Sequence, residues 1–360
     1  MPGPREALIN SGVPVPARAE PETITPHSQP AIDHAKELLR PRVRRQKKLT
    51  RRDSFLAEID SVTPWNKLHK LIEPFYPKVE GAGRPPIGLA RMLRMYVAQQ
   101  CFGLSDEGIE DAIYDSQAIR AFVGIDLGRE TAPDATTLLK FRHLLEAKHL
   151  TRQIFDAING HLAEKGLMMR EGTIVDATLI AAPPSTKNKD GKRDPEMHQS
   201  KKGNDWHFGI KAHIGVDAAS GLVHTVVCTA GNVSDVTQAH ALLHEDETAA
   251  LGDAGYQGVE KRPENVGKAV TWHIAMKRSK QKALPKNKLG RMMEKLEHLK
   301  ASVRAKVEHP FYVIKNLFRH RKTRYRGLAK NTAQLFTLFG FANLVLAGRR
   351  FRVTETRVAS

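Results

Sequence analysis

Cysteine, aromatic residues and long apolar runs are all scarce in this 360-residue sequence. The two cysteines, Cys101 and Cys228, cannot form a disulfide framework, which fits a reducing cytoplasm. They also lie far apart in the chain, so we expect no zinc site. The longest apolar stretch, residues 335–347, is shorter than the roughly 20 residues that a membrane-spanning helix needs. The N-terminus lacks the apolar segment of a secretory signal, so we expect a cytoplasmic protein without a membrane span.

Acidic side chains are also in short supply. The sequence has 57 lysines and arginines against 39 aspartates and glutamates, which gives a net charge of +18. The whole excess lies between Lys277 and Arg352, where 21 basic residues accompany only three acidic ones. A solvated helix surface usually mixes both signs. Because a concentrated basic excess favours polyanionic partners, we expect this region to lie along DNA.

The first 52 residues are rich in proline and end in a basic run, residues 36–52. This composition has too few large apolar side chains to bury a core, so we expect a disordered extension over residues 1–52. The basic run is compatible with either a DNA-contacting arm or a solvated linker.

Residues 53–168 have the apolar spacing of helices, with apolar side chains at three- and four-residue steps. A helix is expected to end at Gly103, and Ser105 is placed to cap the next one. Two helices joined in this way fit either a helix-turn-helix or a plain helical bundle. We expect an all-helical N-terminal domain that binds DNA.

At Gly172 the apolar period changes from 3.6 residues to two, which predicts strands. Strands are expected at residues 173–180, 208–216, 222–229, 249–252 and 270–276. Helices are expected after Ser234 and over residues 286–318, the latter with a break near Pro310. This order predicts an α/β fold, a mixed sheet flanked by helices, over residues 169–350, followed by a tail at residues 351–360.

Three acidic residues have unusual surroundings. Asp176 lies within an apolar strand, Asp253 ends a later strand before small residues, and Glu308 stands alone in the basic region. Singly, they are explained as a strand-end acid, a turn residue and an ion-pair partner of Arg304. As a set, they offer the oxygen ligands that Mg²⁺ or Mn²⁺ prefers, and two such ions can activate phosphoryl transfer.

Further residues are candidates for contact with DNA. Lys211 and His213 lie on the polar face of the strand at 208–216, where we expect them near the three acids and bound to phosphate. Lys201 and Lys202 belong to a basic loop that either follows DNA or is mobile. The aromatic rings of Trp206 and Tyr256 fit either stacking on an unpaired base or packing at a sheet edge.

The sequence resembles the DDE transposases of bacterial insertion sequences, in particular the insertion sequence five family, from about Trp65 to Arg350. The resemblance depends on blocks in a fixed order, which are residues 83–86, 133–142, 174–178, 185–197, 206–213, 252–256, 304–311 with Lys315, and 326–331. Its last motif reads Tyr, two residues, Arg, three residues, Glu, six residues, Lys. Arg304, Glu308 and Lys315 match this motif, whereas Ala301 replaces the tyrosine.

The resemblance implies an RNase H-like catalytic domain in which Asp176, Asp253 and Glu308 bind two Mg²⁺ or Mn²⁺ ions. It also implies that Arg304 and Lys315 contact phosphates near the scissile bond and that the Arg326 block meets DNA. Such an enzyme binds the terminal inverted repeats of its element, cleaves phosphodiester bonds at the ends and joins the 3′-hydroxyls to target DNA.

Holding two DNA ends together implies a homodimer or a higher oligomer, and a DNA substrate implies association with the nucleoid. Two other functions remain open at this point. A nuclease of the same fold would cut DNA without joining strands, and a non-enzymatic repressor would need only the basic surface.

Overall fold

The structure is a computed structural model that describes residues 48–78, 85–168, 172–189, 191–244 and 247–358, without the side chains of Lys202 and of residues 351–358. The chain divides into two units after Lys48, and the residues from Leu49 onward form one of them. The predicted extension therefore falls almost entirely outside the described residues. Only its last residues are described, where a helix begins at Arg51.

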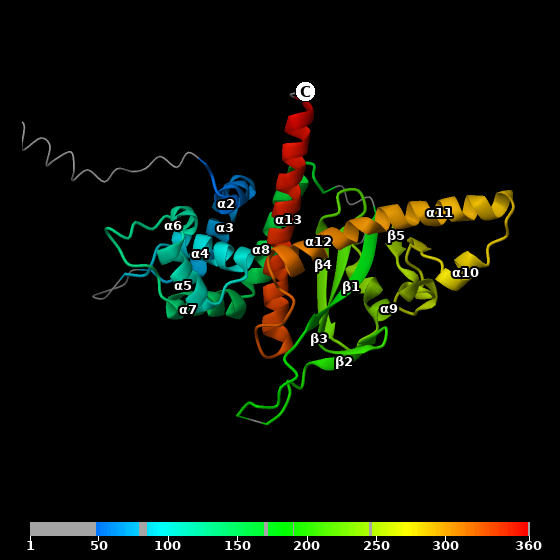
Figure 1. The fold of residues 1–360 in the computed structure, drawn as a ribbon, viewed down its shortest axis with the longest axis horizontal. Coiled ribbons are helices and arrows are strands. Elements are labelled where there is room, and N and C mark those ends of the chain that lie inside the picture. Colours follow the sequence, from blue (N-terminus) through cyan, green and yellow to red (C-terminus); the bar gives the residue numbers. More distant parts are fainter. Residues whose placement is uncertain (1–47, 79–84, 169–171, 190, 245–246, 359–360) are drawn as a thin grey trace, which may run out of the picture. The chain divides into compact units, whose positions relative to one another are not determined.

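The first part of the unit is helical, as predicted (Figure 1). Its helices are α2 (Arg51–Val62), α3 (Trp65–Ile72), α4 (Leu89–Phe102), α5 (Asp106–Asp115), α6 (Gln117–Val123), α7 (Ala135–Ala147) and α8 (Leu150–Glu164). Gly103 ends α4 in the left-handed conformation, with φ of 63°, and the Ser105 hydroxyl accepts a hydrogen bond from the Gly108 N–H. Both signals act as expected from the sequence.

Helices α4 and α5 belong to a bundle rather than to a DNA-reading pair. Most residues of α4 are buried in the core. In a helix-turn-helix, α5 would enter the major groove, but its polar residues are acidic and it contains no basic one. The acidic residues are Asp106, Glu107, Glu110, Asp111 and Asp115. Phosphates would repel this helix, so the bundle is the better of the two interpretations.

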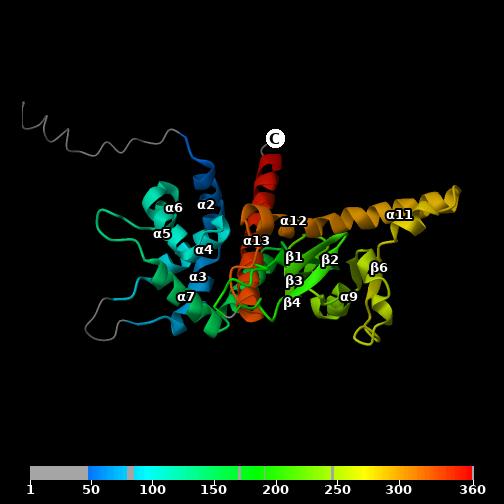
Figure 2. The same cartoon turned by 60° about the horizontal axis from the view of Figure 1, so that its bottom comes forward.

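The second part is built on a mixed sheet, as predicted, and this sheet has six strands. Its strands are β1 (Thr173–Ala181), β2 (His198–Lys202), β3 (Asp205–Asp217), β4 (Val223–Ala230), β5 (Ala249–Gly252) and β6 (Thr271–Ile274). The strands β1, β5 and β6 are parallel, whereas β3 pairs antiparallel with β1, β2 and β4. Figure 2 shows the sheet with helices against it.

The structure differs from the predicted elements in three places. Strand β2 lies inside the segment expected to be a loop, because it extends the hairpin with the first residues of β3. The expected helix 286–318 is divided at Ala305, and not near Pro310, into α11 (Lys288–Arg304), η5 (Ala305–Val307), α12 (Glu308–Tyr312) and η6 (Val313–Leu317). Pro310 lies in the first turn of α12, where a missing N–H has little cost. Helix α13 (Leu328–Val358) continues through most of the predicted tail.

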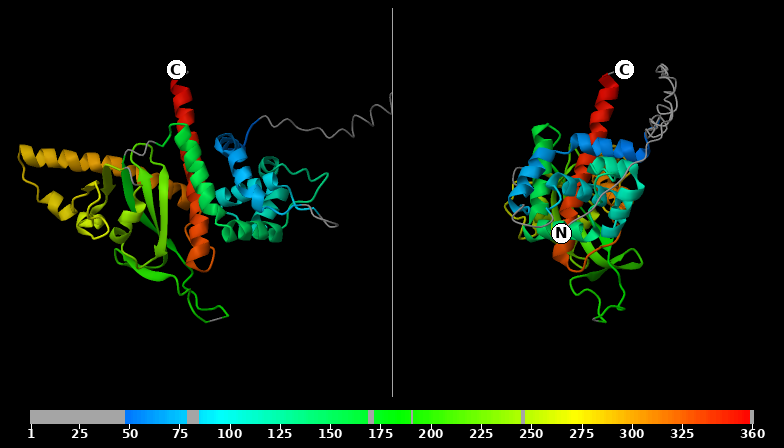
Figure 3. Two further views of the ribbon diagram at one scale, coloured as in Figure 1. Left: turned by 180° about the vertical axis from the view of Figure 1, so that it is seen from behind. Right: turned by 90° about the vertical axis from the view of Figure 1, so that its left-hand side faces the viewer.

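Helix α13 joins the helical part to the sheet (Figures 1 and 3). It packs against α8 and β4, and its apolar residues belong to one core cluster with both. The buried Asn343 amide donates to the Asn159 side chain at 2.8 Å and to the Val223 carbonyl at 2.7 Å, while its oxygen accepts from the Val223 N–H. These bonds fix α13 to α8 and to the start of β4. Among the described helices, none has the length and apolar character of a membrane span.

The two faces of the sheet are covered differently. Ile174 and Ile180 of β1 and Ile214 of β3 pack into the large core that contains α13. Val175 belongs to a second, smaller core with Tyr256 and residues of the short helices α9 (Asp235–Gln238), η2 (Ala239–Leu242), η3 (Ala254–Tyr256) and η4 (Val259–Lys261). Alternate residues of β1 therefore face different helices.

Candidate active site

The parallel pair of β1 and β5 places Asp176 and Asp253 side by side. Ile174 of β1 pairs with Leu251 of β5, and the two aspartates lie two residues further along their strands. Asp253 continues the extended backbone of β5, with φ of −75° and ψ of 179°, before η3 begins. Because the two strands are parallel, residues two positions after a paired couple are again neighbours, so Asp176 lies next to Asp253. Asp253 follows the carboxyl end of β5, and α/β proteins commonly bind ligands at this edge of a sheet.

The Asp176 carboxyl group is largely buried, and burial raises its pKa to about 7. The Ala177 N–H, which donates to Asp176 Oδ1 at 2.7 Å, lowers this pKa. The carboxylates of Asp253 and Glu308 raise it further, and the Arg304 guanidinium lowers it. The pKa of Asp176 therefore depends on both other acids of the predicted set and on Arg304.

Glu308 is brought to the sheet by the division of the long helix. It is the first residue of α12, directly after the short turn η5, and its side chain is exposed. The predicted alternative, a simple ion pair between Arg304 and Glu308, does not occur among the salt bridges of the described residues. Arg304 instead ends α11 within electrostatic reach of Asp176.

Lys315 connects the following helical turn to β1. Its Nζ donates to Thr178 Oγ1 at 2.5 Å and to the Leu179 carbonyl at 3.0 Å. Thr178 and Asp176 are two residues apart on one strand, so their side chains share a face of the sheet. The ammonium group thus lies on the Asp176 side of β1.

The three carboxylates have no ion-pair partners among the described residues. Within the part of the chain that the structure describes, no lysine, arginine or histidine lies within ion-pair distance of Asp176, Asp253 or Glu308. Asp253 accepts the Gly255 N–H at 2.8 Å and caps η3. A partly buried group of like charges is costly unless a cation joins it. An all-oxygen donor set of this kind fits Mg²⁺ or Mn²⁺.

Lys211 and His213 do not join this group, in contrast to the prediction. In the register of β3 with β1, His213 is opposite Ala177 and Lys211 is opposite Leu179, whereas Asp176 is opposite Ile214. Directly opposite side chains share a face, so both basic residues lie on the other face of the sheet from Asp176.

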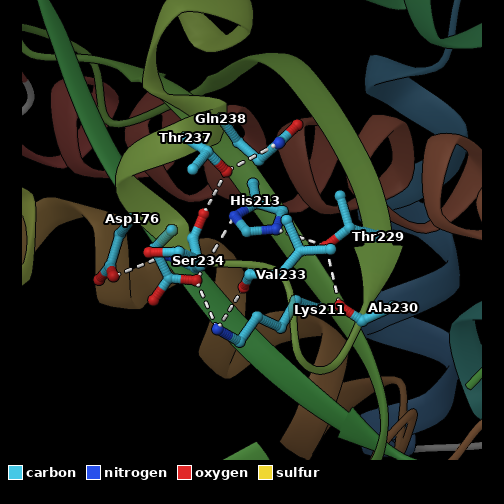
Figure 4. A network of polar contacts seen from close by, with 11 residues as sticks. Asp176, Lys211, His213, Thr229, Ala230, Val233, Ser234, Thr237 and Gln238 are labelled. Atoms are coloured by element: carbon cyan, nitrogen blue, oxygen red, sulfur yellow. Dashed lines mark hydrogen bonds and ion pairs between the residues drawn. The ribbon is translucent and has the colours of Figure 1, made fainter. Parts of the chain in front are cut away.

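Both side chains already have partners on that face (Figure 4). Lys211 Nζ binds Asp235 Oδ1 at 2.9 Å and the Val233 carbonyl at 2.8 Å. The His213 ring has no exposed surface and contacts Thr229 Oγ1 at 2.8 Å through Nε2. Burial lowers the His213 pKa to about 4, so its ring is neutral at pH 7. A neutral, fully buried imidazole cannot contact phosphate, and the predicted DNA contact of His213 is wrong.

The remaining predicted DNA contacts lie away from the three acids in the fold. Lys201 is exposed on β2, with Nζ 6.0 Å from the centre of the exposed Trp206 ring, while the side chain of Lys202 is outside the described residues. Arg326 is exposed in the turn before α13. Asp194 holds this turn by accepting the Gly327 N–H at 2.7 Å. The loop at residues 185–197 thus anchors the start of α13.

The sequence left open whether Tyr256 stacks on a base or packs, and in the structure this residue lies near the acids. The Tyr256 side chain is buried, and its hydroxyl has no hydrogen-bond partner among the described residues. Burial raises the Tyr256 pKa, and the carboxylates of Asp176, Asp235 and Asp253 raise it further. Tyr256 is therefore a neutral phenol beside the acids, and it packs rather than stacks on a base. Its position three residues after Asp253 was the one signal in the sequence.

Comparison with known families agrees with this architecture. Residues 168–344 match the transposase DDE domain, and residues 43–144 match a second transposase domain, DUF772. No solved structure matches the chain. The two ranges together cover most of the sequence, the first contains the sheet with all three acids, and both domains are those of transposases. The chain therefore belongs to the DDE transposases.

Proposed function

We propose that this transposase binds the terminal inverted repeats of its element, cleaves phosphodiester bonds at the ends and transfers the 3′-hydroxyl ends to target DNA. The observation that carries the proposal is the shared register of Asp176 and Asp253 beyond the β1–β5 pair, with Glu308 in electrostatic contact. Phosphodiester cleavage needs charge stabilisation at both the attacking and the leaving oxygen. Three carboxylates without basic partners are suited to holding the cations that supply it.

Each residue has a distinct role in this proposal. Asp176, Asp253 and Glu308 would hold two Mg²⁺ or Mn²⁺ ions, which activate the nucleophile and stabilise the leaving oxygen when bound. Arg304, within electrostatic reach of Asp176, and Lys315, bound to Thr178, would orient the phosphates next to the scissile bond. The buried Tyr256 would remain a neutral phenol within electrostatic reach of Asp176 and Asp253.

The finer assignments belong to the same proposal. The mixed sheet, with one acid within the central strand β1 and another directly after its parallel neighbour β5, supports an RNase H-like catalytic domain over residues 169–350. The block order supports the insertion sequence five family. We assign recognition of the DNA ends to the helical part, at residues 53–168. We also propose a dimer or higher oligomer that holds two ends, in the cytoplasm and associated with the nucleoid.

A pre-cut DNA end separates the proposed reaction from simple nuclease activity. Purified protein with Mg²⁺ is expected to cleave an intact element end and also to join a pre-cut 3′-hydroxyl end to target DNA. Both products should disappear with EDTA and return with Mg²⁺. Cleavage without joining would indicate a nuclease. Binding of the ends with neither product, at any concentration of Mg²⁺ or Mn²⁺, would favour a repressor.

Lys315→Ala is expected to weaken binding of the DNA ends and to flatten its dependence on salt. Loss of one phosphate contact lowers the slope of log K against log salt concentration by about one. The matched control is Lys261→Ala, which removes an exposed lysine from outside the basic region. Equal slopes for wild type and Lys315→Ala in a salt titration by fluorescence anisotropy would exclude a phosphate contact at this position.

A further inference from the structure

A second group of metal-ligand side chains, separate from the three acids, lies at the start of β1. His224 is the second residue of β4, His244 follows η2, and Glu247 comes two residues before β5. One ligand atom from each of the three lies within 4.8 Å of the other two. The group is half-buried to buried, and the Glu247 side chain is 1% exposed.

Within this group, nitrogen and oxygen atoms that could bind a metal lie close to one another. Both ring nitrogens of His244 are buried without a hydrogen-bond partner among the described residues, and Nε2 is 3.5 Å from Glu247 Oε1. The His224 ring crosses that of His244 edge to face, with centroids 4.9 Å apart. A buried imidazole nitrogen without a partner is costly. A metal ion bound by both rings would give one of the two His244 nitrogens a partner.

The surrounding residues hold the ligands as an outer shell does in metalloproteins. His224 Nδ1 is 2.9 Å from Thr225 Oγ1, which leaves Nε2 on the side of the group. The Thr173 hydroxyl donates to Glu247 Oε1 at 2.7 Å and lies 3.0 Å from His224 Nε2. The backbone N–H of His244 also donates to Glu247 Oε1. These bonds fix the Glu247 carboxylate beside both rings.

Gly215 makes room for the His224 ring. A Cβ at this position would lie 2.7 Å from His224 Cε1 and 2.2 Å from the Leu242 carbonyl oxygen. Any other residue would therefore push the ring and the end of η2 away from the sheet. Because Gly215 has no side chain, the His224 ring can pack against β3 and reach the group.

We propose that His224, His244 and Glu247 bind one zinc ion, separate from the ions held by the three acids. Two imidazoles and one carboxylate are a known zinc ligand set and leave a fourth position for water. Mg²⁺ prefers oxygen ligands only, so the two sites select different metals. Zinc ligands at about 2.0–2.1 Å from the ion lie roughly 3.3 Å apart, so the side chains would close around it. This site revises the expectation from the sequence that the protein has no zinc site.

A zinc ion at this position would support the catalytic scaffold. It would join β4 and the segment before β5, and the Thr173 hydroxyl would link it to the first residue of β1. Asp176 lies three residues after Thr173, and Asp253 follows directly after β5. The zinc site would thus hold the starts of the two strands that position Asp176 and Asp253.

The test uses full-length protein from which any histidine tag has been removed. After treatment with chelator, incubation with Zn²⁺ and gel filtration, the wild type is expected to retain about one zinc ion per chain by mass spectrometry. Co²⁺ should give the visible absorption of a tetrahedral site. His244→Ala and Glu247→Gln should weaken binding at least about 100-fold, and Thr173→Val about tenfold or more.

Two controls separate this site from others on the chain. His298→Ala removes an exposed histidine of α11 and should retain zinc. Asp176→Asn should also retain zinc while it loses the proposed Mg²⁺ site, so the two proposals can fail independently. Wild-type protein that binds no zinc, or unchanged binding by Glu247→Gln, would overturn the zinc site. If the variants do not fold, as judged by circular dichroism, the Co²⁺ spectrum of the wild type decides, and its absence overturns the site.

Discussion

Asp253→Asn is expected to reduce DNA cleavage at least about 10³-fold and to leave binding of the element ends largely intact. The amide keeps the size of the carboxylate and its capping bond to the Gly255 N–H, so the fold is retained. It loses the charge that holds a cation next to Asp176. Cleavage of a labelled end under single-turnover conditions, with binding measured in parallel by anisotropy, gives both quantities.

The matched control for this substitution is Glu260→Gln, an exposed acid in the same segment of the chain. It should leave cleavage and binding unchanged. If Asp253→Asn lowered binding and cleavage by the same factor, the defect would be in DNA recognition or folding. That result would contradict the role of Asp253 as a metal ligand.

Without metal, the protein is expected to lose up to about 4 kcal/mol of stability between pH 4 and pH 7 because of Asp176. The folded-state pKa of Asp176 is raised from 3.8 to about 7. In this window the folded chain holds a proton that the unfolded chain has released, so rising pH favours unfolding. Asp176→Asn should remove this dependence and be the more stable protein above pH 7.

Urea unfolding in EDTA, at pH 5 and pH 8, measures this effect. The exposed Asp205, at the start of β3, provides the control substitution Asp205→Asn, which should keep the wild-type pH dependence. The difference between wild type and Asp176→Asn should shrink when Mg²⁺ is added at pH 8, because the ion stabilises the charged carboxylate. The same change in stability from pH 5 to pH 8 for wild type and Asp176→Asn would show that folding does not shift the pKa of Asp176, and a relative gain for the wild type would show that folding lowers it.

The sequence predicts the strands that carry the site because their signals are local. The change of period at Gly172 and the turn before Leu222 mark β1, β3 and β4, and Ser105 and Gly103 mark helix ends. Strand β2 was missed because polar residues form it, and only its pairing with the start of β3 makes it a strand. Pairing of this kind depends on residues that the local pattern does not contain.

The position of Lys211 and His213 shows a second limit. The alternation along β3 correctly places them on the face away from Ile210 and Ile214. Whether that face is also the Asp176 face depends on register, and a shift of one residue exchanges the faces. The observed pairing of Asp176 with Ile214 places Lys211 and His213 on the opposite face from Asp176. The sequence could predict that Lys211 and His213 share one face of β3, but it could not predict whether that face also holds the acids.

The periodicity of α11 is also insufficient to predict burial. Leucine and methionine recur along it at three- and four-residue steps, which is typical of a helix packed on a core. In this chain Leu289, Met292, Leu296 and Leu299 are more than half exposed. The pattern identifies the helix correctly but does not say whether the apolar side is covered within the same chain.

The zinc ligands could not be found from spacing in the same way. His240 and His244 are four residues apart, which is a common spacing for two ligands on one helix. Only His244 belongs to the group, because η2 ends at Leu242 and the chain turns before it. Its partner His224, on β4, is 20 residues away in the sequence and is brought close by the folding of the sheet.

The most direct test of the account is the position of metal ions in crystals grown with Mn²⁺ and a DNA end. Anomalous scattering is expected to show two ions, about 3.5–4 Å apart, bound by the carboxylate oxygens of Asp176, Asp253 and Glu308. Manganese bound elsewhere, or a DNA complex in which these three carboxylates are too far apart to share an ion, would contradict it.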